Sequence, residues 1–204
     1  MLLIPPSLPL LLALAVAPAV APVLPGTIQG GQATDRQADP VAVCVVAPRV
    51  EAVQQGDAIG VVPTPRPVLL VVEPLLEIRL ERAGRVVWRH VARSGEVITG
   101  PMAWPGLPLA PGEVVLLRLR PQQAAPGTFA HVQLIGGSAA RMAQTARLMA
   151  ALAHRPAAWL QAVDAALDQG DVPLAWTLLF APKAPLSPEL QELRNQVLQQ
   201  GCGE

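Results

Sequence analysis

The sequence contains three histidines, residues that can act as metal ligands or as a general base. His90, His131 and His154 lie far apart, and no His-x-x-x-His or Cys-x-x-Cys spacing accompanies them. Structural zinc sites are usually built from such closely spaced pairs, so the sequence predicts no metal centre. A lone histidine without a partner motif is more often structural or exposed, and we expect none of the three to be catalytic.

The other patterns that resemble reactive sites have structural interpretations that we favour. Ser138 follows a Gly-Gly pair but lacks the Gly-x-Ser-x-Gly pattern of a hydrolase nucleophile, and we interpret it as a helix N-cap. Asp164 and Asp168 share one helix face, and Asp171 is predicted to cap the next helix. Neither Gly-Gly pair has the lysine or the spacing of a phosphate-binding loop. The sequence therefore predicts no catalytic residue and no cofactor.

Two cysteines and one tryptophan remain as candidate site residues. Cys44 and Cys202 lie near opposite ends of the folded part, and in an oxidising compartment they could form a disulfide that closes nearly the whole domain into a loop. The alternative is a buried thiol at Cys44 and a free thiol at Cys202, and the sequence leaves both open. Trp104 lies in the loop-like stretch Met102–Gly106, either as an exposed partner contact or as a buried cap.

The composition excludes several classes of protein. The 204 residues include 15 Lys+Arg and 15 Asp+Glu, so the formal net charge is zero; 51% are hydrophobic and 15% are charged. A basic nucleic-acid-binding protein needs an excess of positive charge, and a disordered chain needs fewer apolar residues. Only one stretch that is both uncharged and predominantly apolar is long enough to span a bilayer, which excludes a polytopic membrane protein. A small globular protein remains.

That uncharged stretch covers the first 34 residues, which contain no Asp, Glu, Lys or Arg. The apolar run Leu8–Ala17 has the length of a signal-peptide core, and small residues follow at the spacing of a cleavage site. Six prolines between Pro5 and Pro25 argue against a continuous spanning helix. We predict a signal peptide over residues 1–24 and a linker over 25–40. The protein would then be periplasmic or secreted, and it would contact the membrane only through this leader during export.

The segment after the linker, residues 41–136, has the pattern of short β-strands. Runs rich in Val, Leu and Ile alternate with Pro/Gly turns at Val41–Ala47, Val68–Val72, Leu75–Glu81, Arg85–Ala92, Glu113–Arg120 and Phe129–Ile135. This spacing is typical of an antiparallel, immunoglobulin-like β-sandwich, which we predict over residues 41–136.

The rest of the chain has helical periodicity. Ser138 is predicted to start a helix that ends near His154, and Pro156 starts the next, which reaches Asp168. Further helices are predicted over Pro173–Phe180 and from Ser187 onward. The fold class is therefore α+β, with a helical region over residues 137–204 packed on the sandwich.

The arginine-rich segment Glu73–Arg93 is predicted to be a hairpin rather than a helix. A three-residue loop over 82–84 would place Glu81 opposite Arg85, Glu77 opposite Arg89 and Glu73 opposite Arg93. We disfavour a two-residue loop, because it would place Arg82 against Arg85.

Four short motifs carry a family resemblance: Cys44, the run Pro67–Val72, the turn Leu109–Gly112 and the tail segment Trp176–Leu179. Their order resembles a family of uncharacterised secreted cyanobacterial proteins with a signal peptide, an early cysteine, a β-sandwich and a helical tail. The resemblance covers most of the mature chain. It implies export and this fold, but no known activity.

Taken together, the leader, the strands and the absence of a catalytic constellation indicate an exported non-catalytic interaction module of the envelope or extracellular space. Its partner would be a protein or an envelope component. One alternative is an enzyme with a divergent site at the sandwich–helix junction that uses His131 or His90. The other is an intracellular scaffold whose helical half binds through an exposed apolar stripe along Trp159–Leu167.

Overall fold

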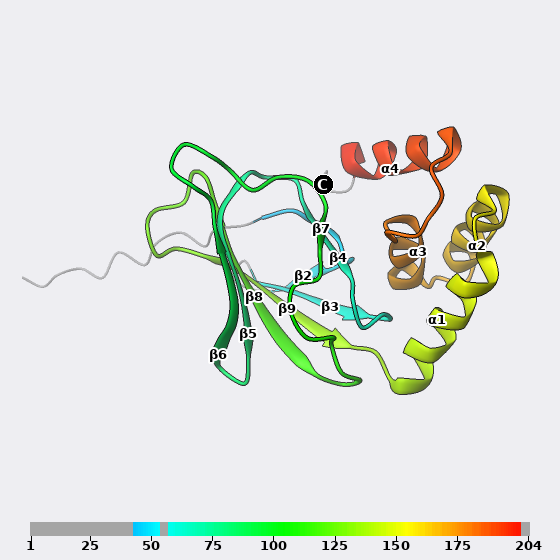
Figure 1. The fold of residues 1–204 in the computed structure, drawn as a ribbon, viewed down its shortest axis with the longest axis horizontal. Helices are drawn as coiled ribbons and strands as arrows, with labels where there is room; N and C mark the ends of the chain where they lie inside the picture. Colours follow the sequence, from blue (N-terminus) through cyan, green and yellow to red (C-terminus); the bar gives the residue numbers. More distant parts are fainter. Residues whose placement is uncertain (1–42, 54–56, 201–204) are drawn as a thin grey trace, which may run out of the picture. The chain divides into compact units, whose positions relative to one another are not determined.

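All strands come before all helices along the described chain (Figure 1). The computed structural model describes residues 43–53 and 57–200, and these belong to one unit that spans residues 38–204. Within them, nine strands form two sheets and four helices follow. The α+β fold class is therefore confirmed.

The larger sheet has six strands in the order β2-β3-β9-β8-β5-β6. The strands are β2 (Glu51–Ala52), β3 (Ala58–Val62), β9 (Ala130–Gly136), β8 (Val114–Pro121), β5 (Leu75–Arg82) and β6 (Arg85–Val91). β3 runs parallel to β9, and all other neighbours in this sheet are antiparallel. The smaller sheet has the order β1-β4-β7, with β1 (Val45–Ala47), β4 (Val68–Val71) and β7 (Met102–Ala103), all antiparallel.

The two sheets share one hydrophobic core. Alternate residues of β5 and β8, such as Ile78, Leu80 and Leu117, are at most 1% exposed and belong to the same cluster as Leu69 and Val71 of β4. Because side chains alternate between the two faces of a strand, the intervening residues of β5 and β8 point away from this core. The outer face of the six-stranded sheet is therefore where the charged residues of β5 and β8 gather.

The four helices begin close to where the sequence predicts them. They are α1 (Ala139–Leu152), α2 (Pro156–Asp168), α3 (Val172–Leu179) and α4 (Pro188–Gln200). The Oγ of Ser138 accepts a hydrogen bond from the Arg141 N–H at 3.2 Å, which caps α1. Asp171 caps α3 in the same way, and Pro156 occupies the first turn of α2.

The helical region contacts the outer side of the smaller sheet (Figure 1). Phe180 and Val197 pack against Val46, Ala47 and Leu70, whose side chains point away from the core between the sheets. β1 and β4 are thus covered on both sides, which explains why every residue of β1 is buried. Within the described residues, no helix is both long enough and apolar enough to cross a membrane.

The predicted register of the β5–β6 hairpin is wrong. The loop has two residues, Ala83 and Gly84, and both have positive φ, at 47° and 73°. This backbone suits the twist of a two-residue hairpin, whereas the prediction avoided it because Arg82 would face Arg85. Arg82 does face Arg85, but its guanidinium donates to the Glu113 carboxylate at 2.7 Å and to the carbonyl oxygen of Leu107 at 2.7 Å. Its charge is therefore paired away from Arg85.

Three short strands were not predicted, while the six predicted runs contain strands. β2 and β7 have two residues each, and β3 contains Gly60, which disfavours a strand by composition. Pairing with β9 makes β3 a strand, and such long-range pairing cannot be recognised in a local window. The part of the Val41–Ala47 run before Val43, like the predicted leader and linker, lies outside the described residues.

Candidate interaction face on the six-stranded sheet

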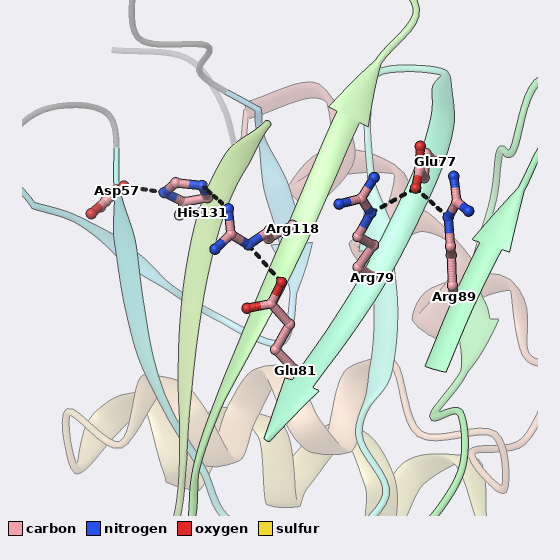
Figure 2. A network of polar contacts seen from close by, with 7 residues as sticks. All are labelled: Asp57, Glu77, Arg79, Glu81, Arg89, Arg118 and His131. Atoms are coloured by element: carbon pink, nitrogen blue, oxygen red, sulfur yellow. Dashed lines mark hydrogen bonds and ion pairs between the residues drawn. The ribbon is translucent and has the colours of Figure 1, made fainter. Parts of the chain in front are cut away.

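Glu77 of β5 is the centre of an ionic cluster on the outer face of the six-stranded sheet. Although charged, it is only 4% exposed. Its Oε1 accepts hydrogen bonds from Arg89 Nε at 2.5 Å and from Arg79 Nε at 2.7 Å, as Figure 2 shows. Arg120 of β8 approaches the other carboxylate oxygen at 3.6 Å. One buried carboxylate thus holds three guanidinium groups from three adjacent strands.

The environment of Glu77 keeps it ionised. Burial by itself raises the pKa of this carboxyl, but hydrogen bonds from Arg89 and Arg79, together with their charges, outweigh burial and leave the pKa below its ordinary value. The hydrogen bond to Glu77 in turn raises the pKa of Arg89. The cluster is consequently a set of permanent charges at neutral pH.

A second chain of polar contacts crosses the same face (Figure 2). Glu81 of β5 contacts Arg118 Nε at 2.7 Å, and Arg118 Nη1 lies 3.4 Å from His131 Nε2 of β9. The other ring nitrogen of His131 lies 3.4 Å from an Asp57 carboxylate oxygen. The face therefore carries both acidic and basic groups from Asp57, just before β3, to Arg89 on β6.

A cation–π contact also positions Arg79 on this face. The Arg79 guanidinium lies 4.4 Å from the centre of the Phe129 ring, which is within cation–π range. We refer to Asp57, Glu77, Arg79, Glu81, Arg89, Arg118, Arg120 and His131 as the charged face. Contacts among these groups hold their side chains in place on the sheet.

β6 forms the edge of the sheet beside this charged face. Among the described residues it pairs only with β5, so the backbone groups along its other side have no strand partner from residues 43–53 or 57–200. None of its seven residues is buried, and Val86, Val87 and Val91 are 43–52% exposed. Trp88 and His90 stack with ring centres 5.9 Å apart. A long edge without a neighbouring strand is a surface to which another strand can add.

The structure does not bring the three histidines together. His131 belongs to the charged face, His90 lies on β6, and His154 lies exposed in the turn after α1. Among residues 43–53 and 57–200, no group of three or more His, Cys, Asp or Glu could hold a metal ion. Neither His90 nor His131 lines the cavity between the smaller sheet and the helices, where the enzyme alternative placed them.

Trp104 is not an exposed contact. It is 6% exposed, belongs to the core between the sheets and donates its indole N–H to the Leu107 carbonyl at 3.0 Å. A large apolar ring next to an open end of the core gains more from burial than from exposure, which accounts for this correction. Trp104 is therefore excluded as a partner contact in this conformation.

The apolar stripe of α2 is buried only in part. Trp159 and Val163 are at most 1% exposed and lie in a core formed by the helices themselves, whereas Leu167 is 41% exposed. The scaffold alternative keeps only part of the exposed surface on which it depended, and it stays a prediction.

The two cysteines are only partly covered by the structure. Cys44 is half-buried just before β1, is not a free thiol, and donates its backbone N–H to the Glu73 carboxylate at 2.8 Å. Cys202 lies outside the described residues, so the Cys44–Cys202 disulfide stays a prediction. Among the described residues, no ion pair joins Glu73 to Arg93, which contradicts the hairpin prediction.

The sequence contained a usable signal for the charged face. Arg118 and Arg120 alternate with leucines along β8, and Glu77, Arg79 and Glu81 alternate with apolar residues along β5. Period-two alternation places each set on one side of its strand. The alternation does not predict that β8 pairs with β5, and this pairing brings the two sets together.

Comparisons with models of known protein families, with curated proteins and with solved structures find no match to this chain.

Proposed function

We propose that this protein is an exported, non-catalytic interaction module that binds an extended segment of a protein partner along β6. The observation that carries this proposal is the β6 edge: seven residues, none buried, with one side of the backbone unpaired by any strand of the described part of the chain. A segment that adds there as a further strand would gain main-chain hydrogen bonds, and its side chains would be selected by the adjacent surface.

The residues of β6 define the chemistry of the partner. The sequence of the strand, Arg-Val-Val-Trp-Arg-His-Val, contains two arginines and no acidic residue. Arg89 is held by Glu77, whereas Arg85 has no ion-pair partner within the described part of the chain. The edge therefore fits a segment that carries both apolar and acidic residues, because the valines and the cations of β6 would both be matched.

The scaffold that supports the edge is, in this proposal, an immunoglobulin-like sandwich of the variable type. The order β1-β4-β7 corresponds to strands A-B-E of that fold, and β9-β8-β5-β6 corresponds to G-F-C-C′. The shared core between the sheets supports the correspondence. The uncharged, proline-containing leader and the family resemblance support export.

Two measurements test these claims. The first is N-terminal sequencing of protein from the extracytoplasmic fraction, which should give a start near residue 25; a cytosolic protein that begins at Met1 would show that export is wrong. The second compares tagged wild type with Val87→Lys in co-purification from the same fraction. A lysine on an edge strand opposes strand addition, so the partner should be lost.

The matched control is Val72→Lys, since Val72 is similarly exposed, at 49%, but lies outside the six-stranded sheet. Loss of the partner in both variants, or in neither, would contradict binding along β6.

A further inference from the structure

A cavity between the smaller sheet and the helices is unrelated to the charged face. It has a volume of about 560 Å³, within the range of small-molecule sites. β4 supplies Val68 and Leu70, β7 supplies Met102, and the helical region supplies Phe180, Leu186 and Leu198. Leu186 is 90% exposed at this cavity.

Arg194 of α4 is the one charged side chain that the described residues contribute to the lining of this cavity. Its Nε donates to the Leu179 carbonyl oxygen at 2.8 Å, which fixes the guanidinium. It has no acidic partner among residues 43–53 and 57–200. Burial lowers the pKa of Arg194, as expected for a guanidinium that has lost water without gaining a counter-ion. A partly buried guanidinium without an acidic partner can bind an anion.

We infer that this cavity binds a single-chain amphipathic carboxylate, such as a free fatty acid, with its carboxylate on Arg194 and its alkyl chain along Leu70, Met102 and Phe180. The apolar lining matches an alkyl chain, and the guanidinium can hold a carboxylate through two parallel hydrogen bonds. Charge complementarity at one end and an apolar wall over the rest distinguish this occupant from an acidic peptide or a neutral lipid.

Calorimetric titration of the full chain with monomeric dodecanoate tests the inference. Binding of one molecule per chain is expected, and Arg194→Met should weaken it by about tenfold or more, the effect of losing a charged hydrogen bond. Arg194→Lys should recover part of the affinity, because the positive charge returns. Lys183→Met is the matched control, since Lys183 is a nearby exposed cation that does not line the cavity, and it should leave binding unchanged.

A second variant keeps the inference testable if Arg194→Met fails to fold. Ala184 lines the cavity, so Ala184→Trp should fill it and abolish dodecanoate binding while Arg194 stays intact. Circular dichroism of each variant verifies the helices.

Four results would overturn the inference: no binding at millimolar dodecanoate, equal binding of dodecanol, undiminished binding by Ala184→Trp, or binding only to phosphatidylglycerol vesicles. Dimerisation that Ala184→Trp abolishes, without any dodecanoate binding, would instead show that a second copy occupies the cavity.

Discussion

Glu77→Gln removes one negative charge from the position where Arg89, Arg79 and Arg120 meet. The substitution keeps the size of the side chain, so any loss reflects charge rather than packing. Removing one member of a fully buried ion pair costs about 3–5 kcal/mol. The three arginine side chains are 18–55% exposed, so water partly screens them. We therefore expect the free energy of unfolding to fall by about 2–3 kcal/mol, less than for full burial.

Thermal unfolding followed by circular dichroism measures this loss. For a domain of this size, the midpoint should fall by roughly 4–12 °C. Glu96→Gln is the control, because Glu96 is exposed and its carboxylate has no partner among the described residues. A Glu77→Gln midpoint equal to that of Glu96→Gln would refute the idea that Glu77 organises the charged face.

The remaining predictions concern acid, backbone packing and a helix cap. Because the folded-state pKa of Glu77 is lowered, its stabilising contribution is complete above the ordinary glutamate pKa of about 4.3 and is lost as pH falls below it; acid titration should therefore destabilise wild type more steeply than Glu77→Gln. Gly136→Ala should destabilise by about 1–3 kcal/mol in urea unfolding, because the new Cβ would lie 2.1 Å from the backbone oxygen of Ala110; unchanged stability would show that this backbone can move. Asp171→Ala should lower the free energy of unfolding by about 1–2 kcal/mol, because both the α3 cap and the ion pair with Arg141 are lost. Asp171→Ser should recover the cap alone. Identical losses of stability in the two variants would contradict the capping role.

The helices were predictable because their ends are encoded locally. A serine or aspartate just before an apolar-periodic segment, or a proline in its first turn, is enough to place the start of a helix, as Ser138, Asp171 and Pro156 show. The strands with strong Val and Leu content were predictable for the same reason.

The hairpin register could not be predicted, because it depends on groups outside the hairpin. Pairing Glu with Arg across β5 and β6 alone favoured a three-residue loop. Glu81 instead pairs with Arg118 of β8, and Arg82 with Glu113 in the loop before β8. Of the three predicted pairs only Glu77 with Arg89 occurs, as a diagonal rather than a directly opposed pair.

The candidate binding surfaces also depend on tertiary pairing. That β6 is an edge follows from the strand order and not from its sequence, and the cavity at Arg194 exists because the helices pack on β4 and β7. Local patterns can predict which side of a strand carries charge, but they cannot predict which strand lies next to it.

Binding of a partner along β6 is tested most directly by photo-crosslinking in cells of the source organism. A photoreactive residue at Val87 should give a discrete crosslinked species, and mass spectrometry should locate the attachment in an extended segment of the partner that carries both apolar and acidic residues. The same photoreactive residue at Val72 should give none. No crosslink at Val87, or the same crosslinked species from both positions, would contradict the proposed interaction.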